Sequence, residues 1–93
     1  MTGRFRVRVK RRAARALEEL PREYQLKVLE VLETLEENPL PHREYDLKKL
    51  RGFEDTFRIR LGGLRVVYSV DWASGTIIVH FIGPRSRAYK RTA

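Results

Sequence analysis

Apolar residues in the first forty positions recur with two different spacings. Residues 4–9 (RFRVRV) alternate strictly between apolar and arginine, which predicts a half-exposed strand. From about residue 11 to residue 20 the apolar positions follow helical spacing, and the stripe stops before Pro21. Proline is accepted in the first turn of a helix, so a second helix is predicted over residues 21–37, ending at Asn38 and the proline after it.

The second half of the chain has the two-residue period of strands. Residues 39–46 (PLPHREYD) are predicted to form a loop, followed by a strand over residues 56–61 (TFRIRL). A Gly-Gly pair then leads into a strand over residues 64–70 (LRVVYSV), which indicates a tight hairpin. Residues 76–82 (TIIVHFI) are apolar on both faces and predict a central strand.

The order of these elements predicts an α+β fold in which an N-terminal strand and a helical hairpin precede a three-stranded antiparallel meander that completes one sheet. With 93 residues and 42% hydrophobic content, we expect one globular domain over residues 1–93. The chain has no cysteine, which excludes disulfides and thiolate chemistry. Its apolar runs are too short for a membrane span or a signal peptide, so a cytoplasmic location is the default expectation.

Positive charge is concentrated at both ends of the sequence. The net charge is +8, and residues 1–17 carry seven Arg or Lys and no acid. Residues 18–55 carry eleven acids against six bases, whereas residues 56–93 carry seven bases and one acid. This asymmetry favours a polyanionic partner, or an acidic protein that covers the same surface. A soluble basic protein without a special partner is the alternative interpretation.

Three arginines fall on one face of the predicted hairpin. Arg58 and Arg60 alternate with the apolar residues of their strand, and Arg65 occupies the corresponding side of the next strand. If the apolar sides meet the helices, the three arginines share the open side of the sheet. Clustered like charges repel one another unless an anion compensates them, which predicts a phosphate site and therefore RNA as the ligand. A solvated strand face charged for solubility is the alternative.

A short basic segment follows the last strand. It carries Arg85, Arg87 and Tyr89, whose ring can stack and whose phenol can form hydrogen bonds. Lys48 and Lys90 are further candidates for RNA contacts. The alternative is a frayed basic terminus without a specific role.

Other catalytic arrangements have weaker support. His42 and His80 allow a ribonuclease with one imidazole as base and one as acid. However, His42 lies in a predicted loop and His80 in the most apolar strand, where a buried neutral histidine is more common. Glu54, Asp55 and Asp71 are too scattered to form a metal cluster, so neither a metal nor a cofactor is expected.

Four motifs together resemble the RelE toxins of prokaryotic type II toxin–antitoxin systems, within the RelE/ParE superfamily. The motifs are K-L-R-G at 49–52, F-R-I-R-L at 57–61, L-R-V-V-Y-S-V at 64–70 and G-x-R-x-R-x-Y at 83–89. The short archaeal members are the most similar. The resemblance implies a fold like that of the small microbial ribonucleases.

The resemblance also implies an activity. RelE toxins are metal-independent endoribonucleases that cut mRNA in the A site of the 70S ribosome by attack of a 2′-hydroxyl on the adjacent phosphate, which inhibits translation. The implied partners are mRNA on the ribosome and a cognate antitoxin in a toxin–antitoxin hetero-oligomer, without a membrane. A gyrase inhibitor like those of the ParE branch and a non-catalytic RNA-binding or ribosome-binding protein are the alternatives.

The resemblance assigns roles by position. The family's two strand lysines match Arg58 and Arg60, its following strand arginine matches Arg65, its late catalytic arginine matches Arg85, and its C-terminal tyrosine matches Tyr89. Arginine stays protonated, so Arg58 and Arg60 can bind and stabilise a phosphate but cannot act as the general base. The general base is left unassigned.

Overall fold

The computed structural model describes residues 4–84, which form two helices and five strands. In chain order the elements are β1 (Arg6–Val9), α1 (Arg11–Glu19), α2 (Arg22–Glu37), β2 (Asp46–Lys49), β3 (Thr56–Leu61), β4 (Leu64–Asp71) and β5 (Thr76–Pro84). The predicted α+β class is confirmed, and the predicted helices and strands end within a few residues of the observed bounds.

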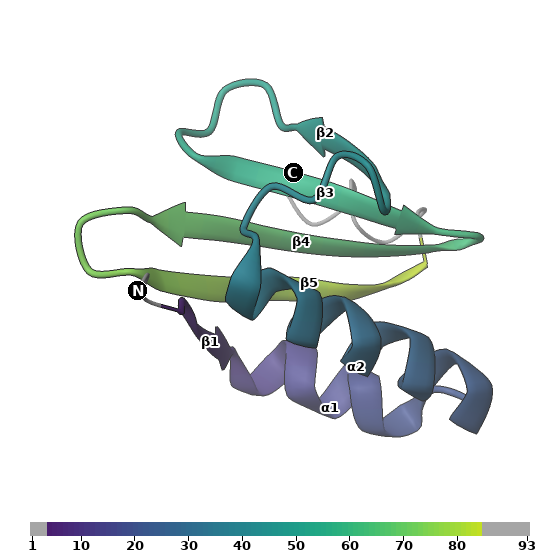
Figure 1. Cartoon of the computed structure of the whole chain (residues 1–93). Coiled ribbons are helices and arrows are strands. Elements are labelled where there is room, and N and C mark those ends of the chain that lie inside the picture. Colours follow the sequence, from purple (N-terminus) through teal and green to yellow (C-terminus); the bar gives the residue numbers. More distant parts are fainter. Residues whose placement is uncertain (1–3, 85–93) are drawn as a thin grey trace.

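The strands form one mixed sheet in the order β1-β5-β4-β3-β2 (Figure 1). Strands β2 to β5 pair antiparallel, while β1 pairs parallel to β5 at the edge of the sheet. The hairpin between β3 and β4 closes through Gly62, whose φ of 60° lies in the left-handed region that glycine adopts without strain. The predicted meander is therefore present, with one strand added on each side of it.

Strand β2 was not predicted from the sequence. Its four residues, DLKK, contain one apolar side chain, and Asp46 lies at the end of the predicted loop. Edge strands tolerate charge on both sides because they pair on one side only, so β2 lacks the apolar alternation by which longer strands are found. Its pairing with β3 places Asp46 opposite Arg60 and Lys48 opposite Arg58.

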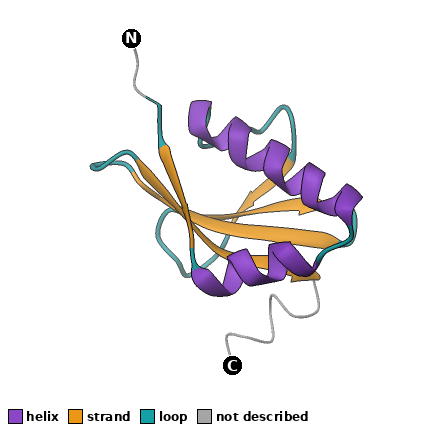
Figure 2. Cartoon of the chain, turned by 90° about the horizontal axis from the view of Figure 1, so that it is seen from below, coloured by secondary structure: helices purple, strands orange, loops and turns teal. Residues whose placement is uncertain are grey.

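Helix α2 covers one face of the sheet, and α1 runs alongside β5 (Figures 1 and 2). The core cluster combines α2 side chains with one face of the three central strands; its most buried members include Val28, Val31, Leu35, Ile59, Val66, Tyr68, Ile77 and Val79. Helix α1 contributes Ala13 to this core. Because α2 occupies one face, the alternate strand positions face the opposite side of the sheet, which we call the open face.

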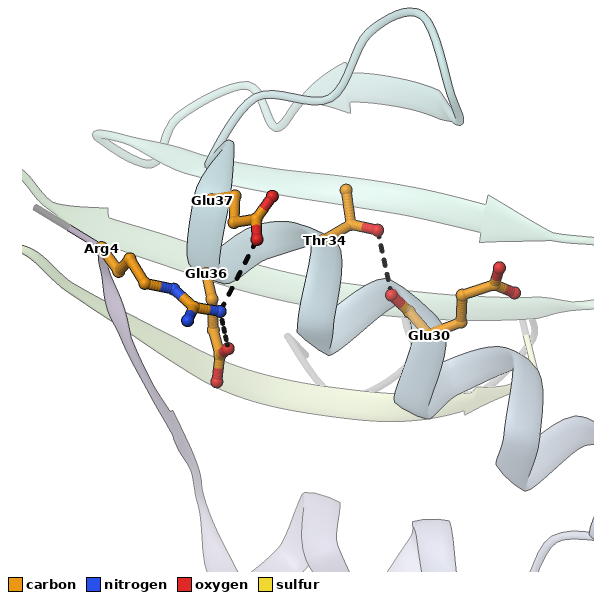
Figure 3. A network of polar contacts seen from close by, with 5 residues as sticks. All are labelled: Arg4, Glu30, Thr34, Glu36 and Glu37. Atoms are coloured by element: carbon orange, nitrogen blue, oxygen red, sulfur yellow. Dashed lines mark hydrogen bonds and ion pairs between the residues drawn. The ribbon is translucent and has the colours of Figure 1, made fainter. Parts of the chain in front are cut away.

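A charged contact joins the start of the described chain to the end of α2 (Figure 3). The Arg4 guanidinium lies 3.0 Å from Glu36 Oε1 and 3.7 Å from Glu37 Oε2. The Phe5 backbone N–H donates to the carbonyl of Glu36 at 2.8 Å. These contacts fix the entry into β1.

Within residues 4–84, neither helix is long and apolar enough to cross a membrane.

Candidate functional site

The open face carries the three arginines that the sequence singled out. Strand pairing places Arg60 directly opposite Arg65, and Arg58 opposite Val67, all on the side away from α2. Side chains directly opposite on neighbouring strands have Cβ atoms about 5 Å apart, so Arg60 and Arg65 are close neighbours. The predicted grouping on one face is confirmed.

Two of these arginines are buried. The relative exposure of Arg58 is 4% and that of Arg65 is 3%, whereas Arg60 is exposed. A charged side chain leaves water only when other groups compensate its charge. Contacts within the fold therefore hold these two guanidinium groups in place. Because both side chains are buried, the alternative interpretation of a solvated, solubility-enhancing strand face is wrong for Arg58 and Arg65. The sequence could not decide this, since alternation gives the face of a side chain but not its burial.

Asp46 on the edge strand β2 links the two arginines of β3. Its Oδ1 lies 3.6 Å from Arg58 Nη2, and its Oδ2 lies 3.5 Å from Arg60 Nε. One half-exposed carboxylate thus serves two guanidinium groups, which restrains both side chains and leaves an excess of positive charge. Sequence reasoning missed Asp46, because only the pairing of β2 with β3 brings it beside the arginines.

The hairpin turn itself holds Arg65. Arg65 Nη1 donates to the carbonyl of Leu64 at 3.1 Å and to that of Gly62 at 3.3 Å. These bonds hold the guanidinium beside the turn, on the strand position that pairs with Arg60. Lys48 faces the same side, since it pairs with Arg58, but its side chain is exposed. We call Asp46, Lys48 and the three arginines the arginine cluster.

A groove crosses the open face next to the arginine cluster, between α1 and the loop that joins β2 to β3. Its walls include Arg12 of α1 and Phe53 of the loop, and its floor includes the Phe81 ring. A Cβ atom on Gly83 would lie 3.0 Å from Cζ of Phe81, so the absence of a side chain at Gly83 leaves room for the outer end of this ring.

Ser69 and His80 form a polar pair on the floor of this groove. Ser69 Oγ lies 2.8 Å from His80 Nε2. Burial of the imidazole, and to a lesser extent the charge of Lys10, lowers the pKa of His80 below its ordinary value, so the ring is neutral at neutral pH. A neutral histidine was predicted at this position. Its contact with Ser69 was not predicted, because a register shift in the β4–β5 pairing brings the two side chains together.

Tyr68 lies on the opposite side of the sheet and takes no part in this site. Its side chain is fully buried, and its hydroxyl donates to the carbonyl of Pro39 at 2.7 Å. Burial raises the pKa of Tyr68 far above the ordinary value of 10.0.

Within the described part of the chain, no three His, Cys, Asp or Glu side chains gather as metal ligands would.

Comparison with known protein families identifies the chain. A family model described as the ParE toxin of type II toxin–antitoxin systems matches residues 7–89. The chain belongs to this toxin family. RelE1 of Methanocaldococcus jannaschii is 38% identical over 87 residues, which cover 94% of this chain and 97% of the relative. The resemblance to RelE toxins is thus confirmed, and the chain is a toxin of a type II toxin–antitoxin system.

Solved structures of RelE toxins share the fold of this toxin. The RelE–RelB complex of Pyrococcus horikoshii contains a chain that is 36% identical, with a TM-score of 0.80 and coverage of 89% of this chain and 97% of that one. In the RelBE2 toxin–antitoxin complex of Mycobacterium tuberculosis the identity is 29%, the TM-score 0.72 and the coverage 88% and 99%. The two helices and the sheet therefore form a RelE-like fold.

The structure locates half of the residues predicted for the toxin's site. It brings Arg58, Arg60, Arg65 and Lys48 together on the open face. The other four predicted residues are Arg85, Arg87, Tyr89 and Lys90, and they lie outside the described residues.

The chemistry available to the arginine cluster is electrostatic. Guanidinium groups donate hydrogen bonds to phosphate oxygens in a planar, two-pronged geometry but do not exchange protons near neutral pH. Groups whose positions are already fixed stabilise developing negative charge without reorganising during the reaction. Arg58 and Arg65 are fixed in this way by Asp46 and by the hairpin carbonyls.

Proposed function

We propose that this toxin is a ribosome-dependent endoribonuclease that cleaves mRNA in the ribosomal A site and thereby inhibits translation in the cytoplasm. In this proposal residues 1–93 make up a single RelE-like toxin domain. The observation that carries it is the arginine cluster, in which Arg58, Arg60 and Arg65 share the open face with one carboxylate between two of them. An excess of fixed positive charge beside a groove suits a phosphodiester better than a neutral substrate.

The proposed reaction is metal-independent transphosphorylation. The 2′-oxygen of a ribose attacks the adjacent phosphorus, the bond from phosphorus to the 5′-oxygen breaks, and a 2′,3′-cyclic phosphate and a 5′-hydroxyl remain. Arg60 is proposed to clamp the phosphate, since its side chain is half exposed and directly opposite Arg65. Arg58 and Arg65 would stabilise the charge that develops on the phosphate oxygens.

Residues after Pro84 enter this proposal through the family resemblance. Arg85 is the first candidate for transition-state stabilisation, Arg87 for a supporting RNA contact, and Lys90 for binding of the backbone. Tyr89 is proposed as a general acid or base or as a stacking residue. A tyrosine with the ordinary pKa of about 10 is a poor base at neutral pH unless nearby cations depress that value.

The requirement for a ribosome follows from what the arginines lack. They supply charge but no proton acceptor, so much of the rate must come from alignment of the 2′-oxygen with the phosphate. Correct alignment is worth about 7–11 kcal/mol of the barrier in well-oriented systems, more than a single stabilising group contributes. We propose that the ribosome supplies this alignment by holding the mRNA, and we expect little cleavage of naked RNA.

A cognate antitoxin is the second proposed partner. The solved relatives from P. horikoshii and M. tuberculosis are toxin–antitoxin complexes. We propose that this toxin forms a similar hetero-oligomer with an acidic or amphipathic antitoxin segment that covers the open face. Such a cover would block access of RNA to the arginine cluster.

Inhibition of DNA gyrase is a second candidate function. The matching family model carries the ParE name. The resemblance to the RelE/ParE superfamily implies inhibition of DNA gyrase for the ParE branch. The sequence relative at 38% identity and the structural match at 36% identity favour the RelE branch. A third candidate, RNA or ribosome binding without catalysis, would leave the mRNA intact.

The test is to map the 5′ ends of a reporter mRNA in a purified translation reaction. We expect new ends within A-site codons for the wild-type toxin, and none on naked RNA. Arg60→Ala and Arg85→Ala should abolish these ends, while Arg43→Ala, which removes an exposed loop cation, should retain them. Intact mRNA in a reaction with active ribosomes would contradict the proposal, and DNA damage in cells with intact mRNA would support gyrase inhibition instead.

A further inference from the structure

A second group of cations lies at the opposite edge of the sheet from the arginine cluster. Every basic side chain of β1 and α1, including the residue that joins them, is exposed: Arg6, Arg8, Lys10, Arg11, Arg12 and Arg15. Strand β1 is one edge of the sheet and β2, which carries Asp46, is the other. We call these six residues the β1–α1 surface; Arg12, at its border, also lines the groove on the open face, and the proposed cleavage reaction assigns no step to any of the six.

The positions of these arginines are unfavourable for α1 itself. The first turn of the helix contains no acidic residue and does contain Arg11 and Arg12, although the helix dipole there disfavours positive charge. Arg15 lies four residues after Arg11 and three after Arg12, the spacings at which like charges on a helix repel one another. No side chain caps the N-terminus of α1 either. Local helix stability therefore does not explain these residues.

The carboxylates of residues 4–84 do not form ion pairs with this surface, although Glu36 lines one hollow together with Arg6 and Arg8. Arg4, just before β1, forms ion pairs with Glu36 and Glu37 (Figure 3). In contrast, the six cations of the β1–α1 surface form no ion pair with any described residue, and their side chains form no hydrogen bond within that range. Their charge is left for a partner.

The surface also lacks the apolar centre of a protein interface. The large apolar side chains exposed in residues 4–84 are Leu26, Leu29, Phe53 and Trp72, and none belongs to β1 or α1. Protein–protein interfaces usually place buried aromatic or aliphatic residues at their centre and charges at the rim. A surface of exposed arginines without such a centre fits a phosphate backbone, which is bound mainly by charge.

We propose that the β1–α1 surface binds the phosphate backbone of ribosomal RNA, separately from the arginine cluster that binds the mRNA. The inference rests on the proposed ribosome-dependent function and adds a second contact to it. On the ribosome, both surfaces would be engaged, and two linked contacts bind far more tightly than either one.

The experiment measures sedimentation of the intact toxin with 70S ribosomes over a series of KCl concentrations. The test variant is Arg11→Gln/Arg15→Gln, which removes two exposed charges from the outer side of α1. The matched control is Lys27→Gln/Arg43→Gln, which removes two exposed charges from α2 and a loop. Circular dichroism checks that each variant is folded.

We expect the test variant to bind about tenfold or more weakly near physiological salt, and its plot of log affinity against log salt to be shallower by about 1–2. The control should stay within about twofold of wild type, because its charges belong to α2 and a loop and are not part of the β1–α1 surface. Equal binding by the test and control variants would overturn the inference. So would normal ribosome binding combined with loss of antitoxin binding, since the surface would then be a protein interface.

Failure of this inference can be separated from failure of the proposed function. If Arg60→Ala binds ribosomes as wild type does but yields no new mRNA ends, while Arg11→Gln/Arg15→Gln binds ribosomes weakly, the two surfaces have the separate roles proposed. If the wild type binds ribosomes through the β1–α1 surface but never cuts mRNA, the RNA surface stands and the nuclease proposal is wrong. If the wild type cuts A-site codons while Arg11→Gln/Arg15→Gln binds normally, the inference is wrong and the nuclease proposal stands.

Discussion

The arginines near the two opposite edges of this sheet have different environments. In the arginine cluster, Arg58 and Arg65 are almost fully buried, and contacts from Asp46 and the hairpin turn fix their guanidinium groups. On the β1–α1 surface the arginines are exposed and form no ion pairs within the described chain. In the proposed function, this difference separates charge that is positioned for chemistry from charge that attracts a polyanion over a distance.

The two environments also respond differently to solvent. Exposed charges are screened within about 10 Å at 0.1 M salt, so binding by the β1–α1 surface should weaken steeply as salt rises. Buried and partly buried pairs are screened much less.

The largest effect is expected for Arg60→Ala in the arginine cluster. Arg60 is half exposed, so its loss should change the free energy of unfolding by no more than about 1 kcal/mol. If it clamps the phosphate, the cleavage rate should fall by about 10²–10³-fold. Quantifying 5′ ends in a purified translation reaction measures this loss, with Arg43→Ala as the control; a loss of less than about threefold would contradict a role for Arg60 in the reaction.

Arg58→Met separates stability from activity at a buried position. An apolar side chain of similar length replaces a buried cation, and the half-exposed Asp46 can hydrate once its partner is removed. We expect the free energy of unfolding to stay within about 1 kcal/mol of wild type or to rise, because hydrophobic replacement of a buried ion pair is often neutral or stabilising. Cleavage should nevertheless fall by about 10²-fold or more.

Urea unfolding combined with 5′-end mapping measures both quantities for Arg58→Met. A variant that is stable and still active would show that neither the fold nor the reaction needs the Arg58 guanidinium, and would contradict its proposed role in cleavage. A variant destabilised by more than about 3 kcal/mol would show that the buried guanidinium makes contacts that methionine cannot replace.

His80, on the groove floor, should make stability sensitive to acid. Burial and the charge of Lys10 lower the pKa of the folded-state imidazole below its ordinary 6.5, so the unfolded chain takes up a proton first as the pH falls. The stabilising contribution is therefore complete above about pH 6.5 and is lost as the pH falls through the lowered folded-state pKa. His80→Gln keeps an amide for Ser69 but does not titrate, so its stability should decline less between pH 7 and pH 5.

Urea unfolding at pH 7, 6 and 5 checks this prediction. The informative quantity is the difference between wild type and His80→Gln, since the other titrating groups are common to both. Parallel pH dependences would contradict the proposed cause.

The smallest effect is expected for the stability of Arg11→Gln/Arg15→Gln. Removing two like charges from α1 relieves their repulsion and their conflict with the helix dipole, so the free energy of unfolding should rise by about 0.5 kcal/mol at low salt. The gain should largely disappear at 1 M salt, where the screening length is about 3 Å. Thermal unfolding at both salt concentrations measures it, and a loss of stability at low salt would show that these arginines make contacts within the fold.

Local patterns in the sequence predicted most of the fold. Strict alternation located β3 and β4 and placed Arg58, Arg60 and Arg65 on one face, because strand periodicity fixes the relative sides of neighbouring residues. The four-residue strand β2 could not be found in this way, since it has a single apolar residue and is defined by its pairing with β3.

The parts of the site that escaped prediction depend on contacts distant in sequence. The ion pairs of Asp46 require the edge pairing of β2, and the Ser69–His80 pair requires the register shift between β4 and β5. The burial of Arg58 and Arg65 likewise depends on packing that alternation along a strand does not specify. The family resemblance supplied the proposed roles of the arginines, which neither periodicity nor burial could have assigned.

We propose that the arginine cluster carries the chemistry and that the β1–α1 surface carries ribosome binding. The most direct test maps mRNA 5′ ends in a purified translation reaction for Arg60→Ala and Arg11→Gln/Arg15→Gln, each at low and at saturating toxin concentration. We predict that Arg60→Ala fails to cut at both concentrations, whereas Arg11→Gln/Arg15→Gln is defective at low concentration and cuts like wild type at saturation. Full activity of Arg60→Ala at saturation, or a defect of Arg11→Gln/Arg15→Gln that persists there, would contradict this division of roles.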